Sequence, residues 1–507
     1  MEDSSHSPGK GRETQTRNLP MTLKTARLAA LAFATLALLG NARAAKEKPN
    51  ILFIIADDQC WETIGAIGGE VITPNLDRLV EEGTRFDHAY NMGSWSGAVC
   101  VASRHMFNTG RTVWNAHRAT KDSSKWRKEH KGTPNPNAIK SWSQLMGDAG
   151  YETYFAGKWH VELFKPDKVF DHVGTVRPGM PNQVPEGYNR PKDENDKEWL
   201  PWDKKWQGFW KGGTHWSEVL RDEAIGFIET AAKEPDPFFM YIAFNAPHDP
   251  RQAPKEFVDM YPLDKVKVPE NFLPRYPYDE QIGCGPKLRD AKLAPFPRTE
   301  YAIKVNRQEY YALITHMDEQ IGKILEALKK SGKADNTYII YTADHGLAVG
   351  HHGLIGKQNM YEHSLCPPLI INGPGIEAGK RIKSRVYIQD IVPTTLELAG
   401  AKPDQPIDFK SLLPHTKGSP SSNRDVIYGA YTKLQRCVIQ DGWKLIHYPE
   451  AEVYRLYHLD KDSDEMTDLA PNPEFAGKLA AMKKVLSEEM LRLNDPLPSK
   501  ASPNPSK

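Results

Sequence analysis

Four short apolar runs stand out in the pattern of hydrophobic and polar positions. They cover residues 50–56, 151–157, 238–244 and 337–343. None of them alternates apolar with polar positions, which is typical of strands buried on both faces of a parallel sheet. The pattern therefore predicts four parallel strands covered by helices.

Helical periodicity lies between these runs. Residues 73–83 start with a cap-like Thr73 and an early proline, and they end at Gly83. Residues 309–330 place their apolar side chains on one stripe, and Gly332 follows. Strands that alternate with helices predict an α/β fold.

The last part of the chain has a different pattern. Three short apolar segments joined by tight turns such as Asp441-Gly442 predict antiparallel strands at residues 425–429, 435–439 and 443–448. A helical pattern follows at residues 476–493. The sequence therefore predicts a second, smaller α+β domain.

Two polar segments have little periodicity. Residues 121–137 are predicted to form an exposed loop. Residues 177–213 form a long insertion with four tryptophans, which are Trp199, Trp202, Trp206 and Trp210. Tryptophan rings can stack on sugars or simply fix a loop to its domain, so both roles stay open.

Acids, histidines or lysines follow all four predicted strands. Ligands of open parallel sheets bind at the carboxyl ends of the strands. Solvated charges at strand ends would explain one or two of these positions, but not four, so we expect one shared site. The residues are Asp57, Asp58, Lys158, His160, His248, Asp344 and His345.

Three of these residues, Asp57, Asp58 and Asp344, supply hard carboxylate oxygens. Clustered carboxylates repel one another unless a cation lies between them. Oxygen ligands favour Ca²⁺ or Mg²⁺ over Zn²⁺. The sequence therefore predicts a site for a hard divalent cation.

A lone cysteine opens a further motif. Arg104 lies one helical turn after Cys100, so both side chains can face one site. By itself the cysteine is equally compatible with burial at a helix start. The motif reads Cys100-Val101-Ala102-Ser103-Arg104 and closes on Thr109-Gly110-Arg111.

This motif resembles the signature of type I sulfatases in the alkaline phosphatase superfamily, with Ala102 where many members carry proline. The resemblance extends over nearly all of the chain beyond its first 44 residues. It includes the Pro49-Asn50 strand ending in Asp58, Gly157-Lys158-Trp159-His160, Pro247-His248, Asp344-His345, Gly356-Lys357 and the closing pattern at 456–469.

The resemblance implies a fold and two cofactors. The fold is an alkaline-phosphatase-like α/β sandwich with a mostly parallel central sheet, plus the smaller α+β domain with its antiparallel sheet. In the family, a formylglycine-generating maturation enzyme oxidises the cysteine to formylglycine (3-oxoalanine), whose hydrate attacks sulfur. One Ca²⁺ is also bound, here implied at Asp57, Asp58, Cys100, Asp344 and His345.

The resemblance also implies catalytic roles. Arg104 would favour the nucleophile's alkoxide, and Lys158 would hold sulfate oxygens. His248, aided by Lys357, would protonate the leaving alcohol. His160 would take a proton from the nucleophile as sulfate departs. The implied catalytic set is Cys100, Arg104, Lys158, His160, His248 and Lys357.

Composition narrows the class of protein. A chain of 507 residues is long enough for two domains. A net charge of +1 gives no indication of nucleic-acid binding, which usually requires a clearly basic protein. A mean hydropathy of −0.59 excludes a polytopic membrane protein.

The N-terminal region resembles a secretory signal. Basic residues precede an apolar stretch at 28–39, and Ala42-Arg43-Ala44 offers a cleavage site after Ala44. The stretch is too short for a comfortable membrane span, so we expect no stable membrane insertion and a periplasmic or secreted protein. The predicted parts are a leader at 1–44, a catalytic domain at 45–417, a C-terminal subdomain at 418–497 and a disordered tail at 498–507.

Export would place the remaining cysteines in an oxidising compartment. They could form two disulfides in any of three connectivities, or stay free and buried. They are Cys60, Cys284, Cys366 and Cys437.

The predicted function is the hydrolysis of a sulfate ester, on a sulfated carbohydrate substrate. One alternative is a formylglycine-dependent phosphonate monoester or phosphodiester hydrolase of the same superfamily. Another is an unmodified, non-catalytic carbohydrate-binding protein.

Overall fold

The computed structural model describes residues 47–131, 133–181, 184–417 and 424–497. The chain divides into two compact units, Met1–Lys48 and Pro49–Lys507, and the second is described here. The predicted leader and the predicted tail at 498–507 lie outside the described residues. In the described ranges, no helix combines the length and apolar character that a membrane crossing requires.

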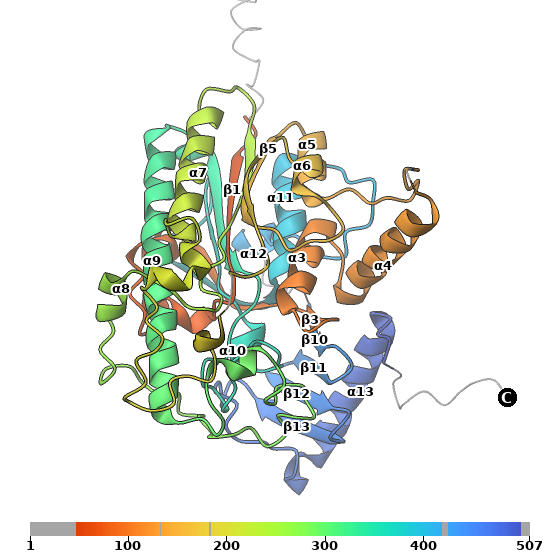
Figure 1. Ribbon diagram of the computed structural model, residues 1–507. Helices are drawn as coiled ribbons and strands as arrows, with labels where there is room; N and C mark the ends of the chain where they lie inside the picture. Colours follow the sequence, from red (N-terminus) through yellow and green to blue (C-terminus); the bar gives the residue numbers. More distant parts are fainter. Residues whose placement is uncertain (1–46, 132, 182–183, 418–423, 498–507) are drawn as a thin grey trace, which may run out of the picture. The chain divides into compact units, whose positions relative to one another are not determined.

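The predicted strands form the centre of an eight-stranded sheet (Figure 1). They lie side by side in the order β4-β6-β1-β7 and are all parallel, which confirms the prediction. Their bounds are β1 (Asn50–Ala56), β4 (Glu152–Lys158), β6 (Phe238–Ala243) and β7 (Thr337–Ala343).

Four further strands complete this sheet. One of them, β8, runs antiparallel to both of its neighbours, β7 and β2. The sheet is therefore mostly parallel, and the predicted α/β class is confirmed. The added strands are β2 (Thr84–Tyr90), β5 (His172–Arg177), β8 (Leu369–Asn372) and β9 (Lys380–Tyr387).

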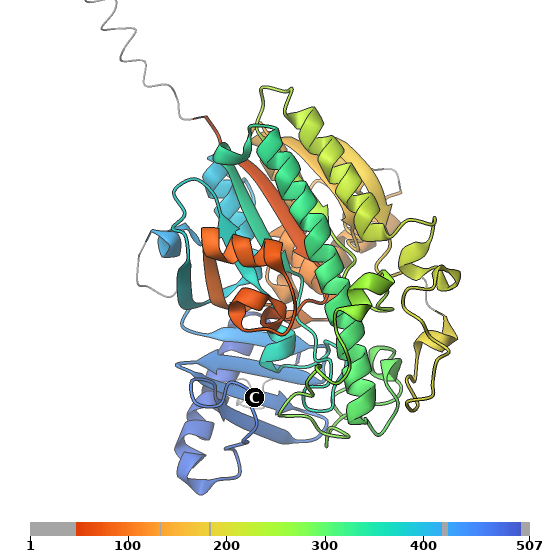
Figure 2. The ribbon, with the colours of Figure 1, turned by 90° about the vertical axis from the view of Figure 1, so that its left-hand side faces the viewer.

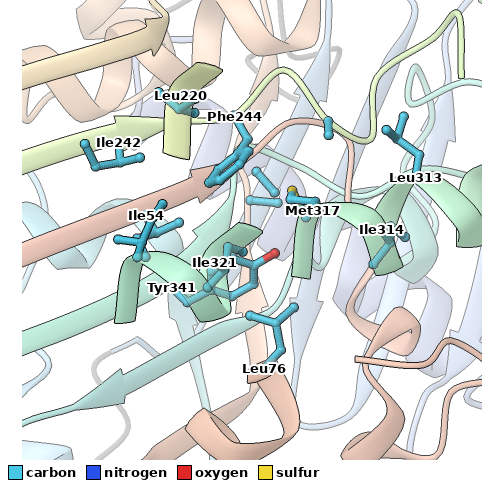
Figure 3. Packing of buried hydrophobic residues seen from close by; sticks show 14 of the residues in the cluster. Ile54, Leu76, Leu220, Ile242, Phe244, Leu313, Ile314, Met317, Ile321 and Tyr341 are labelled. Atoms are coloured by element: carbon cyan, nitrogen blue, oxygen red, sulfur yellow. The ribbon is translucent and has the colours of Figure 1, made fainter. Parts of the chain in front are cut away.

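The two faces of the sheet bury alternate residues of β1. Leu52 and Ile54 pack into one apolar cluster with α2, α7 and α9, part of which Figure 3 shows. Ile51 and Phe53 pack into another with α3, α5 and α11. Figure 2 shows the first face, with α9 crossing the front. The helices are α2 (Pro74–Glu82), α3 (Val99–Thr109), α5 (Trp142–Asp148), α7 (Trp216–Ala231), α9 (Glu300–Lys330) and α11 (Ile391–Ala399).

Two helix predictions and one loop prediction can be compared with the structure here. Helix α9 begins nine residues earlier than predicted, at Glu300, where the Thr299 side chain accepts a hydrogen bond from the Ala302 N–H. Thr73 precedes α2 but does not cap it, because its hydroxyl donates to Asp77 Oδ1. The predicted loop at 121–137 is wrong over its first half, because helix α4 (Val113–Glu129) continues through it. The last buried residue of α4 is Ala116, so the rest of the helix is solvated and shows no apolar stripe in the sequence.

The second sheet has the order β13-β12-β11-β10-β3. Its hairpins are antiparallel as predicted, and Asp441 and Gly442 have φ of 50° and 77°, which suits the tight turn. The sequence analysis missed β13. The elements are β3 (Gly93–Ser94), β10 (Ile427–Tyr431), β11 (Gln435–Gln440), β12 (Trp443–Tyr448), β13 (Val453–His458) and the covering helix α13 (Ala476–Arg492).

The tryptophan-rich insertion packs onto the fold. Trp199 and Trp210 are 7% and 6% exposed. The rings of Trp199 and Trp206 stack with centroids 5.5 Å apart. Trp202 contacts the apolar cluster around α9. These contacts favour the role in which the tryptophans fix the loop to the domain.

Candidate active site

All ten residues singled out by sequence lie around the carboxyl ends of β4, β6, β1 and β7. Asp57-Asp58 follow β1, Lys158 ends β4, and Asp344-His345 follow β7. His160 and His248 lie shortly beyond β4 and β6, and Lys357 lies between β7 and α10 (Glu362–Leu365). Cys100 and Arg104 are both on α3. The sheet order brings these segments together because neighbouring parallel strands end at the same edge.

The three carboxylates are paired with cations of the chain itself. Lys158 Nζ donates to Asp57 Oδ2, and Arg104 Nε donates to Asp344 Oδ2 at 3.0 Å. Lys357 Nζ donates to both oxygens of Asp58 at 2.8 Å. These ammonium and guanidinium groups offset part of the carboxylate repulsion, and the metal site at these residues stays a prediction.

The side chain of Cys100 faces this cluster. One ligand atom from each of Asp57, Cys100, Asp344 and His345 lies within 4.8 Å of the others. On the other side, Cys100 Sγ lies 3.4 Å from His160 Nδ1. The cysteine is thus in contact both with the acidic cluster and with a candidate base.

The spacing of two residues would place Lys158 and His160 on one face if the strand continued, but the strand does not continue to His160. Strand β4 ends at Lys158, and His160 has a positive φ of 54°. This turn directs Lys158 to Asp57 and the His160 ring to Cys100. The ring also packs against Gly179, where a Cβ would lie only 2.4 Å from its nearest atom, so a side chain at 179 would displace His160.

His248 and Lys357 form a second polar pair. His248 Nδ1 donates to the Asp249 backbone oxygen at 2.7 Å, which leaves Nε2 to accept from Lys357 Nζ at 3.1 Å. Burial and the Lys357 ammonium lower the pKa of His248 well below its ordinary value. The pair therefore keeps its proton on the lysine side.

Burial and the paired charges set the remaining pKa values. Burial and the nearby Asp344 raise the pKa of Asp57 well above the ordinary carboxyl value. Burial alone would raise the pKa of Cys100, but Lys158 and Lys357 outweigh it and hold the thiol well below its ordinary pKa. The field at residue 100 thus favours an anion.

The residues present fit a hard divalent cation. Within the described ranges, Asp57 Oδ1 and His345 Nε2 are buried atoms without a hydrogen-bond partner. His345 Nδ1 donates to the Gly346 backbone oxygen at 2.9 Å, which aims Nε2 at Asp58 Oδ1, 3.1 Å away. Such anchoring of one ring nitrogen is typical of metal-binding histidines. Three carboxylates supply the oxygens that Ca²⁺ prefers.

A pocket of about 440 Å³ opens over Cys100, His160, His248 and Lys357. The sequence analysis missed other residues of its wall, because they lie in loops without periodicity. They are Gly97, Ala98, Pro178, Gly179, Met180, Leu288, Arg289, Asp290 and Gln358. Arg289 Nε donates to Asp290 Oδ1 at 2.7 Å, and Gln358 Nε2 donates to Asp290 Oδ2 at 2.7 Å, so this wall is internally hydrogen-bonded.

The cysteines left open by the sequence are free. Cys60, Cys284, Cys366 and Cys437 are all buried and form no disulfide, and neither does Cys100. Burial is sufficient to explain them as small apolar side chains.

Comparison with known proteins gives two family matches. The family model described as sulfatase matches residues 49–401. A second model, described as N-sulphoglucosamine sulphohydrolase, C-terminal, matches residues 350–492.

Curated relatives extend over most of the chain. An arylsulfatase of Clostridium perfringens is 27% identical, with 87% of this chain and 94% of the relative covered. An N-acetylglucosamine-6-O-sulfatase of Bacteroides thetaiotaomicron is 26% identical, with 92% and 91% covered.

Solved structures share the fold. One, in complex with its substrate D-glucosamine-2-N,6-O-disulfate, has a TM-score of 0.68 at 24% identity and covers 90% of this chain and 100% of its own. A phosphonate monoester hydrolase from Silicibacter pomeroyi has a TM-score of 0.68 at 22% identity, with 88% and 95% covered. At these identities the likeness shows the α/β fold with its second sheet.

Proposed function

The chain belongs to the sulfatase family, and from this premise we propose that it removes sulfate from a sulfated carbohydrate after export from the cytoplasm. Sulfate-ester hydrolysis is the activity of the named relatives. The carbohydrate substrate, the formylglycine, the calcium ion and the periplasmic or secreted location are the proposed parts.

A carbohydrate substrate is supported by what the similar proteins act on. One relative is named for N-acetylglucosamine 6-O-sulfate chemistry, and one structural neighbour holds a disulfated glucosamine as its substrate. The second family model is named after N-sulphoglucosamine. The proposal therefore takes a sulfated amino sugar as the first substrate class to test.

The observation that carries the proposal is the position of Cys100. Its Sγ lies in the metal-ligand cluster with Asp57, Asp344 and His345, and it also lines the pocket that contains His160 and His248. A buried structural cysteine would not need a candidate base 3.4 Å away.

A modified residue and a metal ion would complete the site. Formylglycine formed from Cys100 by a maturation enzyme would supply, once hydrated, a hydroxyl nucleophile for sulfur. A Ca²⁺ held by Asp57, Asp58, Asp344, His345 and residue 100 would supply positive charge for the sulfate oxygens.

The chain's own side chains would perform the remaining work. Lys357, which lines the pocket, and Lys158, buried beside Asp57, would offset the negative charge of the sulfate. Lys357 Nζ donates to His248 Nε2, so this pair holds an exchangeable proton on the pocket wall for the leaving alcohol oxygen. His160 lies against residue 100 from the opposite direction and can accept the proton of its hydroxyl. Arg104, wholly buried, holds Asp344 in place.

The decisive experiment examines residue 100 and turnover together. Protein produced with a formylglycine-generating enzyme should carry formylglycine at 100 in its peptide mass spectrum and should hydrolyse an aryl sulfate and N-acetylglucosamine 6-sulfate. Protein produced without maturation should be inactive. Equal activity of the two preparations would refute the proposed nucleophile.

A second candidate is a phosphonate monoester hydrolase, which the fold of the Silicibacter pomeroyi enzyme favours. Matched aryl sulfate and aryl phosphonate monoesters separate the two. A kcat/KM that is higher on the phosphonate would select the second candidate.

The domain organisation remains part of the proposal. We propose a catalytic domain at 45–417 and a C-terminal subdomain at 418–497, preceded by a removed leader at 1–44. The second sheet supports the division, although its edge strand β3 comes from residues Gly93–Ser94. N-terminal sequencing of the exported protein would test the cleavage after Ala44.

A further inference from the structure

A second and larger pocket lies beside helix α4. Its volume is about 830 Å³, and its wall is built from α4, the segment 135–139 and the residues around α6 (Pro166–Val169). Figure 1 shows α4, α5 and α6 on the same side of the large sheet. Its ionisable lining, which defines the "basic pocket", is Arg111, Arg118, Asp122, Arg127, Lys165 and Lys168.

The charge of the basic pocket is strongly one-sided. It presents five cations and one carboxylate, in a chain whose net charge is only +1. Among the described residues, Arg127 and Lys165 are exposed and form no ion pair, whereas Arg111 pairs with Asp408 at 3.1 Å and Lys168 with Asp167 at 3.3 Å. Exposed cations without partners lower the local potential energy of an anionic ligand.

The pocket also contains a fixed aromatic side chain. Trp126 lines it, and one face of its ring stacks on His130, with centroids 3.8 Å apart. Its indole Nε1 donates to the Thr133 backbone oxygen at 3.2 Å. A ring that is already held loses little entropy when a sugar packs against it.

The basic pocket is close along the chain to the pocket over Cys100, His160, His248 and Lys357, which is called the nucleophile pocket after the proposed role of residue 100. His160 lines the nucleophile pocket, and Leu163, Phe164 and Lys165 line the basic pocket. Five residues span at most about 18 Å even when fully extended. The walls of the two pockets thus approach each other to within the length of an oligosaccharide of several sugar units.

A second set of contacts links the two places. The ring of Trp95 stacks on His117 of α4, with centroids 5.1 Å apart, and meets His105 of α3 at 5.7 Å. His105 Nε2 accepts from the Glu162 N–H at 3.2 Å. Helix α4 is thus joined to the helix that carries Cys100 and to the segment that follows His160.

We propose that the basic pocket is a secondary binding site for a sulfated oligosaccharide chain whose reacting end occupies the nucleophile pocket. The site binds distant sulfate groups through its arginines and lysines, while Trp126 packs against a sugar ring. The inference rests on the proposed carbohydrate sulfatase function and deepens it, since it makes the substrate an oligosaccharide or polysaccharide.

The test uses two neighbouring cations of one helix turn. Arg127 lines the basic pocket, whereas Lys128 is exposed in the same last turn of α4 and does not line it. Arg127→Glu and Lys128→Glu change the net charge and the helix end equally. Both are made in the Cys100→Ala chain, and the affinity for a heparin octasaccharide is measured by calorimetry.

Arg127→Glu should weaken octasaccharide binding about tenfold, because an attraction becomes a repulsion, while Lys128→Glu should change it less than twofold. Lys165→Glu, on the opposite wall, should act like Arg127→Glu and serves if that variant fails to fold. Equal losses in Arg127→Glu and Lys128→Glu would overturn the proposal. Equal affinity for a single-stranded DNA of the same charge would overturn the sulfated-sugar assignment.

Measurements of turnover distinguish a failure of the basic-pocket proposal from a failure of the proposed function. In the mature Cys100 chain, Arg127→Glu should leave hydrolysis of a small aryl sulfate unchanged and raise KM for long sulfated chains. Absence of aryl sulfate turnover in the unsubstituted mature protein would refute the function but not the binding result. Normal turnover with no difference between the two α4 variants would refute the basic pocket alone.

Discussion

The site around Cys100 and the basic pocket differ in how their charged side chains are paired. Around Cys100, each buried carboxylate has a buried cation within hydrogen-bonding distance, such as Asp344 with Arg104 at 3.0 Å. In the basic pocket, exposed cations such as Arg127 and Lys165 form no ion pair with any described residue. A buried charge must be paired because its desolvation is costly, whereas an exposed charge stays hydrated and can remain unpaired.

This difference in charge pairing suits the region around Cys100 to a reaction and the basic pocket to the attraction of an anionic ligand. A buried, paired cluster keeps its geometry and its protonation states, which a reaction requires. Exposed cations without an ion pair, such as Arg127 and Lys165, attract anions over distance, but this attraction is screened by salt. Substitutions should therefore reduce turnover steeply in the first region and affinity moderately in the second.

The largest effect is expected for Cys100→Ala. Loss of the nucleophile should lower kcat on an aryl sulfate about 10⁴-fold or more, with little change in melting temperature. Cys437→Ala, at another buried free cysteine, is the matched control and should lower stability while leaving kcat within about twofold. Substantial turnover by Cys100→Ala would contradict the view that the region around Cys100 carries out the reaction.

Asp344→Asn should come next, because it breaks a fully buried pair. Loss of the carboxylate beside Arg104 should cost about 3–5 kcal/mol of folding free energy and should lower the bound calcium measured by elemental analysis. Asp259→Asn, beside the exposed Lys255, should cost about 0–1 kcal/mol. Similar losses in the two variants, or unchanged calcium in Asp344→Asn, would contradict the assignment.

His248→Ala should have a substrate-dependent effect. A sugar is a poor leaving group and needs a proton, so kcat/KM on a sugar sulfate should fall about 10²–10³-fold. An activated aryl sulfate should lose much less, because its leaving group departs without help. Lys357→Ala should show the same difference between the two substrates. Equal losses on both would assign His248 and Lys357 to sulfate binding instead.

The smallest effect is expected from salt. Raising NaCl from about 0.05 to about 0.5 M shortens the screening length about threefold. Octasaccharide affinity of the Cys100→Ala chain should fall about tenfold, and that of its Arg127→Glu derivative should fall less. The kcat of the mature enzyme on a small aryl sulfate should change less than about twofold, because buried pairs are screened weakly. Equal salt sensitivity of affinity and kcat would contradict the contrast between the two regions.

Much of the fold was predictable from local pattern. The apolar runs at β1, β4, β6 and β7 were recognised because a strand buried on both faces must be continuously apolar. The helix α4 was misread, since its solvated half shows no apolar stripe. Strand β13 was missed because it lies half-buried at the edge of its sheet.

The sequence by itself determined which residues gather at the site. It showed that Asp57, Lys158 and Asp344 each end or follow a buried strand, and parallel strands bring such ends to one edge of a sheet. It also marked Cys100 and Arg104 as one helical turn apart. These conclusions need only periodicity and short spacings, which a linear chain contains.

Only the tertiary structure decided how these groups pair and what surrounds them. Lys357 binds Asp58 across 299 positions of sequence, and Arg289 joins the pocket wall from a loop without periodicity. The basic pocket likewise combines α4 with residues 163–168. Contacts between distant segments depend on strand order and loop path, and these follow from the packing of the whole core, which no local pattern encodes.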